Sequence, residues 1–294
     1  MIGPLIRAPH RAPRATPLLP GAPRRAKNAL ENLLEAVVAP FSSWERIPLV
    51  VERVEIALEG LAPAFAGYRI AFLADLHNSR IVPRWWLERA VAVANGLGAD
   101  LIAMGGDFVD DDETYAPSLA EILLPLRAPD GVVGVLGNHD HYVDAAAVRA
   151  AIVAGGVREL HNEPLVLQRG AAQLAVAGVG DLERDAIDFA RVLAGVPEQV
   201  PRVVLSHDPD VFAYWPDGLR LDLMLAGHTH GGQAYLPVLG PPFVPSQFGF
   251  RYLKGLVREA GRQLYVSRGV GAAGLPIRWR CPPELTLVVL QSAA

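Results

Sequence analysis

Residues 69–77 read RIAFLADLH, and this stretch contains the pattern that decides the fold. Residues 69–74 are mostly apolar, which is typical of a β-strand that is buried on both faces. Asp75 and His77 follow at the point where such a strand should end. Open α/β folds place their chemistry at the carboxyl ends of buried strands. The stretch therefore predicts a buried sheet with a polar site at its edge.

Four more polar clusters occur further along the chain, and most of them also follow a short apolar run. They are Gly105-Gly106-Asp107, Gly137-Asn138-His139-Asp140, Ser206-His207 and Gly227-His228-Thr229-His230. Asp, Asn and His supply the oxygen and imidazole ligands that suit divalent metal ions. Five such clusters in this order indicate a two-metal hydrolytic site built from several strand ends.

Strand and helix patterns alternate between the clusters. We expect strands at 50–58, 69–74, 100–104, 131–136, 202–205, 221–225, 263–266 and 285–290, and a hairpin of 164–168 with 173–179. We expect helices at 83–95, 118–126, 143–154 and 185–193. The expected fold class is α/β, with two packed mixed β-sheets flanked by helices.

The N-terminal part of the chain differs from the rest in composition. Residues 1–28 are rich in proline and in Lys and Arg, contain no acidic residue and predict a disordered basic tail. Residues 29–47 predict an amphipathic helix and a linker, and residues 48–294 predict one folded domain. The tail is either solvated or bound to anionic lipid. The helix either packs on the domain or anchors it at a membrane interface.

Composition limits the classes of function. The net charge of −4 over 294 residues gives no reason to expect a nucleic-acid partner. Cys281 is the only cysteine, so neither an intrachain disulfide nor a thiolate metal cage can form. No uninterrupted apolar run reaches the roughly 18 residues of a spanning helix. We expect a cytoplasmic protein, with peripheral contact at the inner face of the membrane as the open alternative.

Taken together, the five clusters over about residues 68–290 resemble the calcineurin-like metallophosphoesterase family. The longer motif Gly227-His228-Thr229-His230-Gly231-Gly232-Gln233 and the sequence Pro282-Pro283-Glu284-Leu285 resemble its bacterial membrane-associated phosphodiesterase branch. Some members of that branch act as UDP-diacylglucosamine pyrophosphatases. The resemblance implies an α/β/β/α sandwich and a metal-dependent phosphoesterase.

The resemblance also implies roles for individual residues. Two divalent ions, which could be Mn, Fe or Zn, would be held by two ligand sets that share Asp107 as a bridge. One set is Asp75, His77, Asp107 and His230, and the other is Asp107, Asn138, His207 and His228. His139 would stabilise the phosphoryl charge and protonate the leaving group, while Asp140 would orient its imidazole. Asp110, three residues after Asp107, is a further candidate to support the site.

The implied reaction is cleavage of a phosphodiester or pyrophosphate bond, in a lipid-linked or nucleotide substrate, by attack of a metal-bridging hydroxide. The alternatives are a phosphomonoesterase or protein phosphatase and a catalytically silent interaction scaffold. Arg80 and Arg268 are candidate phosphate clamps. Phe243, Phe248 and Phe250 lie in the proline- and aromatic-rich segment 236–254. This segment is either a packed irregular loop or an apolar lip for the substrate.

Overall fold

Two six-stranded β-sheets form the centre of the computed structural model, which describes residues 43–293. The first sheet has the strand order β1-β12-β2-β3-β4-β5. Its strands are β1 (Val50–Leu58), β12 (Glu284–Ser292), β2 (Arg69–Leu73), β3 (Leu101–Met104), β4 (Val132–Gly134) and β5 (Arg158–Glu159). Neighbouring strands are parallel except for the pair β12 and β2.

The second sheet has the order β10-β11-β9-β8-β7-β6. Its strands are β10 (Gly255–Glu259), β11 (Arg262–Val266), β9 (Leu223–Ala226), β8 (Arg202–Leu205), β7 (Ala172–Gly178) and β6 (Glu163–Arg169). The four central strands are parallel, and an antiparallel strand pairs with each end of that group. Both sheets are therefore mixed, as the sequence predicts.

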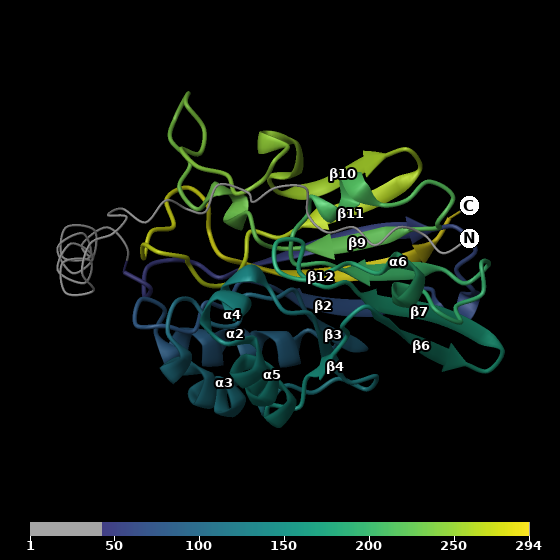
Figure 1. Cartoon of the computed structure of the whole chain (residues 1–294), viewed down its shortest axis with the longest axis horizontal. Helices are drawn as coiled ribbons and strands as arrows, with labels where there is room; N and C mark the ends of the chain where they lie inside the picture. The colour runs from purple at the N-terminus through teal and green to yellow at the C-terminus, as the bar shows by residue number, and fades with distance from the viewer. Residues whose placement is uncertain (1–42, 294) are drawn as a thin grey trace.

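Three apolar cores separate four layers. The core between the sheets takes side chains from both of them, including Phe72, Val203 and Leu225. A second core lies between the first sheet and helices α2 (Arg84–Gly96), α3 (Ala116–Leu123) and α5 (Ala145–Ala154). These helices gather along one side of the molecule (Figure 1). A third core covers the outer face of the second sheet beneath α6 (Phe189–Val192) and α7 (Val211–Tyr214). The architecture is the expected α/β/β/α sandwich.

This arrangement positions the polar clusters. Strands β2, β3 and β4 run parallel in one sheet, so the residues that follow them leave at the same edge. Strands β8 and β9 do the same in the other sheet. Since the two sheets pack face to face through a common core, all five clusters can meet where these strands end.

Most of the predicted elements are confirmed, with small shifts at their ends. The predicted helix 143–154 is confirmed as α5, and a separate short helix before it was not predicted. A short helix α4 (Asn138–Val143) contains the third polar cluster, and Asp144 then starts α5 by accepting hydrogen bonds from the N–H groups of Ala146 and Ala147. Such side-chain capping is what begins a new helix.

The predicted helix 185–193 is largely wrong, because only α6 (Phe189–Val192) is helical. The Asp185 carboxylate accepts the N–H of Asp181, and Asp188 accepts the N–H of Arg191. Asp side chains that bond nearby backbone groups compete with a continuous helix. The sequence analysis also missed strands β5 and β10. Short 3₁₀ helices at Pro63–Phe65, Glu113–Tyr115, His230–Gly232 and Gly249–Tyr252 complete the structure.

The predictions for residues 1–28, and for the segment 29–47 as far as residue 42, lie outside the described residues. Among the helices of residues 43–293, none combines the length and the apolar character needed to cross a bilayer.

Candidate functional site

Five of the seven expected metal ligands have a left-handed backbone. The φ angles of these residues are 55° for Asp75, 47° for His77, 52° for Asp107, 69° for His228 and 51° for His230. Positive φ is uncommon outside glycine, although Asp, Asn and His adopt it more readily than most residues. Residues in such conformations tend to gather at functional sites. Here each bend turns the chain sharply after a strand and directs a polar side chain into one shared volume.

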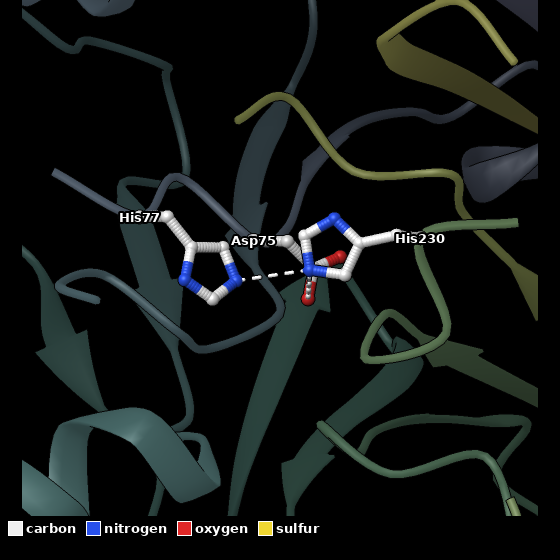
Figure 2. Close-up of side chains that lie close together, drawn as sticks. All are labelled: Asp75, His77 and His230. Atoms are coloured by element: carbon white, nitrogen blue, oxygen red, sulfur yellow. Dashed lines mark hydrogen bonds and ion pairs between the residues drawn. The ribbon is translucent and has the colours of Figure 1, made fainter. Parts of the chain in front are cut away.

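Asp75, His77 and His230 form the first cluster, with one potential ligand atom from each residue lying within 4.8 Å of the others. Figure 2 shows the two imidazole rings facing each other beside the Asp75 carboxylate. The Nε2 atoms of His77 and His230 are 2.9 Å apart. Asp75 Oδ2 is buried and has no hydrogen-bond partner. Buried polar atoms are normally paired, so an unpartnered carboxylate oxygen beside two imidazoles fits a cation site.

Asp107, His207 and His228 form the second cluster. His207 Nε2 lies 3.2 Å from Asp107 Oδ2 and 3.0 Å from the amide oxygen of Asn138. His228 Nδ1 lies 3.1 Å from His207 Nε2. His207 Nδ1 donates to the Gly105 carbonyl, and the Pro245 carbonyl accepts a hydrogen bond from the His228 ring. These outer hydrogen bonds fix which ring nitrogen points into the site.

Asp107 lies between the two clusters. Its Oδ2 is 3.5 Å from His77 Nε2 in one cluster and 3.2 Å from His207 Nε2 in the other. Burial favours the protonated acid, but His207, His139 and His77 lower the pKa of Asp107 well below its usual range. The carboxylate is therefore ionised at a point that both clusters share, which is the geometry that a bridging ligand requires.

His139 belongs to the same polar centre. Its side chain is 27% exposed, whereas His77 and His207 are buried completely. Its Nδ1 lies 2.8 Å from the Asp110 carbonyl oxygen and 3.2 Å from Asp110 Oδ1. The same Asp110 carboxylate lies 3.0 Å from His77 Nδ1. Asp110 therefore fixes the orientation of both rings.

The expected contact between Asp140 and the His139 imidazole is not what the structure shows. The Asp140 carboxylate accepts hydrogen bonds from the N–H groups of Phe108, Val109 and Gly137. It thereby connects the loop after β3 to the start of α4. Burial and the nearby Asp107 raise the pKa of Asp140 to about 6. Asp110 replaces Asp140 as the residue that orients His139.

The candidate substrate residues fall into different environments. Arg80 is exposed. Arg268 forms ion pairs with Glu52 at 2.7 Å and with Glu284 at 2.8 Å, so its guanidinium is not free to act as the expected phosphate clamp. Phe248 is half-buried and packs against Tyr214 and Tyr252 beside the third core, which fits the packed-loop alternative at this residue. Phe243 and Phe250 are exposed.

The sequence analysis missed Arg278, which lies buried behind His230. Its guanidinium donates to the carbonyl groups of Arg268, His230 and Gly271. Its Nη2 lies 2.9 Å from His230 Nδ1. Arg278 therefore holds the ring from its Nδ1 side, with Nε2 directed toward His77 and Asp75. No motif identified this residue, because its role depends on a fold that places residue 278 beside residue 230.

Comparisons with known proteins agree with this geometry. The sequence profile described as calcineurin-like phosphoesterase matches residues 68–232. The chain is 32% identical over 252 residues to the metallophosphoesterase YkuE of Bacillus subtilis, covering 83% of this chain and 87% of that protein. It is 35% identical over 232 residues to the phosphodiesterase YaeI of Escherichia coli, covering 76% and 83%. A transmembrane protein with a metallophosphoesterase domain from Danio rerio is 30% identical over 285 residues, covering 91% and 63%.

Replacing Arg278 with Met should weaken divalent-metal binding about 10- to 100-fold, the usual effect of removing a residue that orients a ligand. Titration of the metal-free protein with Mn²⁺ or Zn²⁺ in competition with a chelator measures this affinity. Arg278→Lys keeps the positive charge but not the planar guanidinium, and should recover part of the metal affinity. Arg280→Met at an exposed neighbour is the control. If Arg278→Met bound metal with unchanged affinity but melted at a lower temperature, Arg278 would stabilise the loop without affecting the metal ligands.

Proposed function

The chain belongs to the calcineurin-like phosphoesterase family, and we propose that it hydrolyses a phosphodiester or pyrophosphate bond in a substrate with an apolar group. Proteins of this family are metal-dependent hydrolases of phosphoesters, and this chain is one of them. The observation that carries the proposal is the position of Asp107 between two clusters of imidazole and carboxylate ligands.

The family uses a dinuclear site, and we assign its ligands as two sets that share Asp107. Asp75, His77 and His230 complete one set, and Asn138, His207 and His228 complete the other. The unpartnered Asp75 Oδ2 and the facing Nε2 atoms support this assignment. Two divalent ions held there would neutralise phosphate charge and activate water for attack on phosphorus.

We assign His139 as the residue that contacts the reacting phosphate and protonates the leaving oxygen. Asp110 takes up Nδ1 of this ring, which leaves Nε2 for the substrate. Burial alone would lower the pKa of His139, but Asp107 and Asp110 raise it to about 10 in the metal-free protein. Both carboxylates favour the protonated ring, which suits the role of a proton donor.

A diester or pyrophosphate suits this site better than a monoester. A monoester dianion is favoured by guanidinium donors that contact its phosphoryl oxygens next to the ions. On the His230 side of the site, Arg278 and Arg268 are already engaged by carbonyl and carboxylate groups. The phosphodiesterase activity in the name of the relative YaeI supports the same choice. The UDP-diacylglucosamine type of pyrophosphatase remains the more specific form of the proposal. A silent scaffold is disfavoured because the sequence keeps Asp, Asn or His at all seven proposed ligand positions.

An exposed apolar hairpin follows the ligand His230 and supports an apolar substrate group. Leu236 and Gly240 pair across the hairpin, and its tip carries Val238 at 104% and Leu239 at 78% exposure. The hairpin rises from the body of the molecule (Figure 1). Trp279 is also exposed, and its backbone pairs with that of Ala234. Exposed apolar surface of this kind commonly marks an interaction site.

The same segment is connected to the metal ligands. The Pro245 carbonyl accepts a hydrogen bond from the His228 ring. Asp210 accepts hydrogen bonds from the Ser246 hydroxyl and from the Gln247 N–H, both at 2.6 Å. The base of the lip is therefore held against the second ligand set, and its apolar tip lies further out.

We expect His139→Ala to bind both ions yet to lower kcat by about 10²–10⁴-fold on an alkyl phosphodiester, the scale of a positioned acid. The loss should be smaller when the leaving group is p-nitrophenolate, which needs no proton. Mn-, Fe- and Zn-loaded protein is assayed on monoester, diester and pyrophosphate substrates, with metal content measured in parallel. His161→Ala, outside the site, is the control. An equal loss for every leaving group would argue against proton donation, and faster turnover of monoesters would contradict the proposed substrate class.

Replacing Phe243 and Phe250 with Ser should raise KM for a long-chain alkyl phosphodiester about 10-fold or more, because the lip loses apolar contact area. KM for a methyl phosphodiester should barely change, since that substrate does not reach the lip. Val153→Ser removes an equally exposed apolar side chain from α5 and serves as the control. If both substrates are affected alike, the segment supports the fold and does not select the substrate.

We also propose that the basic tail brings the protein to anionic membranes. Replacing three of its basic residues with Gln should lower binding to phosphatidylserine vesicles about 100-fold at low salt, from about 1 kcal/mol for each charge. The residues to replace are Arg24, Arg25 and Lys27. Sedimentation of the full chain with such vesicles measures the binding. A control removes the same number of charges from the described surface, at Arg127, Arg158 and Arg258. Equal binding of both variants would leave the tail without a membrane role.

A further inference from the structure

Tyr142 lies beside His139 on the same short helix. The two residues are three positions apart on α4, so they share one face of the helix. Their ring centroids are 5.4 Å apart, and the ring planes make an angle of 51°. Tyr142 is 41% exposed, so its ring borders the open side of the site next to the proposed proton donor.

The loop that follows β7 fixes this ring from outside the helix. The Tyr142 hydroxyl donates a hydrogen bond to Glu183 at 2.5 Å. The guanidinium of Arg184 lies over the ring, with Cζ 4.2 Å from the centroid. Stacking of this kind holds an arginine in place while leaving its N–H groups free to bond elsewhere.

Arg184 is a cation that the described structure leaves available. It is exposed and hydrogen-bonds the Tyr142 side chain, and among residues 43–293 no carboxylate forms an ion pair with its guanidinium. Arg268 and Arg278, on the other side of the site, are both engaged. The His139 side of the site therefore offers an ordered guanidinium, and the His230 side offers the apolar lip.

We propose that Tyr142 and Arg184 form a subsite for the leaving group, and that this group carries its own phosphate. The inference rests on the proposed function and selects the pyrophosphate over the simple diester. A phosphate leaving group is an anion that an arginine binds through two parallel N–H donors. An alcohol leaving group carries no charge of this kind for Arg184 to hold.

The reaction balances as a hydrolysis. The oxygen of water forms a bond to one phosphorus, and the bond from that phosphorus to the bridging oxygen breaks. The bridging oxygen keeps the electron pair and leaves on the second phosphate, beside Arg184. The two protons of the water end on the phosphate products or in solvent.

Two uridylyl substrates with different leaving groups test the subsite. UDP-glucose releases glucose 1-phosphate, and uridine 5′-(p-nitrophenyl phosphate) releases p-nitrophenolate. For the metal-loaded full chain, Arg184→Gln should lower kcat/KM for UDP-glucose about 10- to 100-fold, the scale of a charged hydrogen bond. The aryl ester should lose about threefold or less. Arg191→Gln, an exposed arginine of α6, is the matched control and should leave both rates unchanged.

The tyrosine variants separate the ring from its hydroxyl. Tyr142→Phe keeps the surface on which Arg184 stacks and should affect UDP-glucose little. Tyr142→Ala removes that surface and should reproduce the effect of Arg184→Gln. Glucose 1-phosphate should inhibit hydrolysis of the aryl ester competitively, and Arg184→Gln should weaken this inhibition about 10-fold or more. Glucose without a phosphate should not inhibit.

Several results would overturn the inference. They are an equal loss for both substrates in Arg184→Gln, unchanged inhibition by glucose 1-phosphate, or a wild-type protein that cleaves the aryl ester but not UDP-glucose. If Tyr142→Ala lowered kcat/KM for UDP-glucose and Arg184→Gln did not, the subsite would bind an aromatic ring of the substrate and not a phosphate. Failure of the metal-loaded protein on every phosphoester would contradict the proposed function itself, and would be recognised by the absence of aryl ester cleavage.

Discussion

The buried negative charge of Asp107 is the interaction around which the site is built. The residue is 1% exposed at the junction of the two sheets, where an ionised carboxylate is stable only if its neighbours compensate the charge. Imidazoles from both sheets do so, and the backbone N–H of His139 donates to its Oδ1. Gly137 must lack a side chain, since a Cβ there would lie 2.2 Å from that oxygen. Asp107 is therefore compensated only when the strands of both sheets pair in the observed register.

The parts of this arrangement that sequence could predict are those encoded locally. A buried strand followed by Asp75 and His77 specifies both its own end and the ligands that follow it. The parts that were missed depend on tertiary contacts. Arg278 acts on a residue 48 positions away in the chain. Asp140 belongs to one motif and Asp110 follows another by three residues, and only the folded loop decides which of them contacts the His139 ring.

The same reasoning explains the smaller errors. Phe248 and Phe250 are two residues apart in one aromatic-rich segment, yet one packs on Tyr252 and the other is exposed. Composition alone could not separate them. The segment 185–193 has helical spacing, but its Asp185 and Asp188 side chains bond to nearby backbone N–H groups.

The surroundings of the site differ between its two sides. An apolar hairpin follows His230, whereas Tyr142 and Arg184 lie beside His139.

The left-handed backbone at the ligands also limits how this protein can change over evolutionary time. Asp, Asn, His and Gly tolerate a positive φ, whereas β-branched residues do so poorly. At Asp75 or His228, a change to Val would therefore damage the fold and the metal site together. A change to Gly would remove the ligand, a change to Asn would replace the carboxylate or imidazole with a neutral amide, and either would leave the bend intact. A lineage can thus lose catalysis here by single substitutions that the scaffold accepts, and the folded chain would then be free to acquire another use.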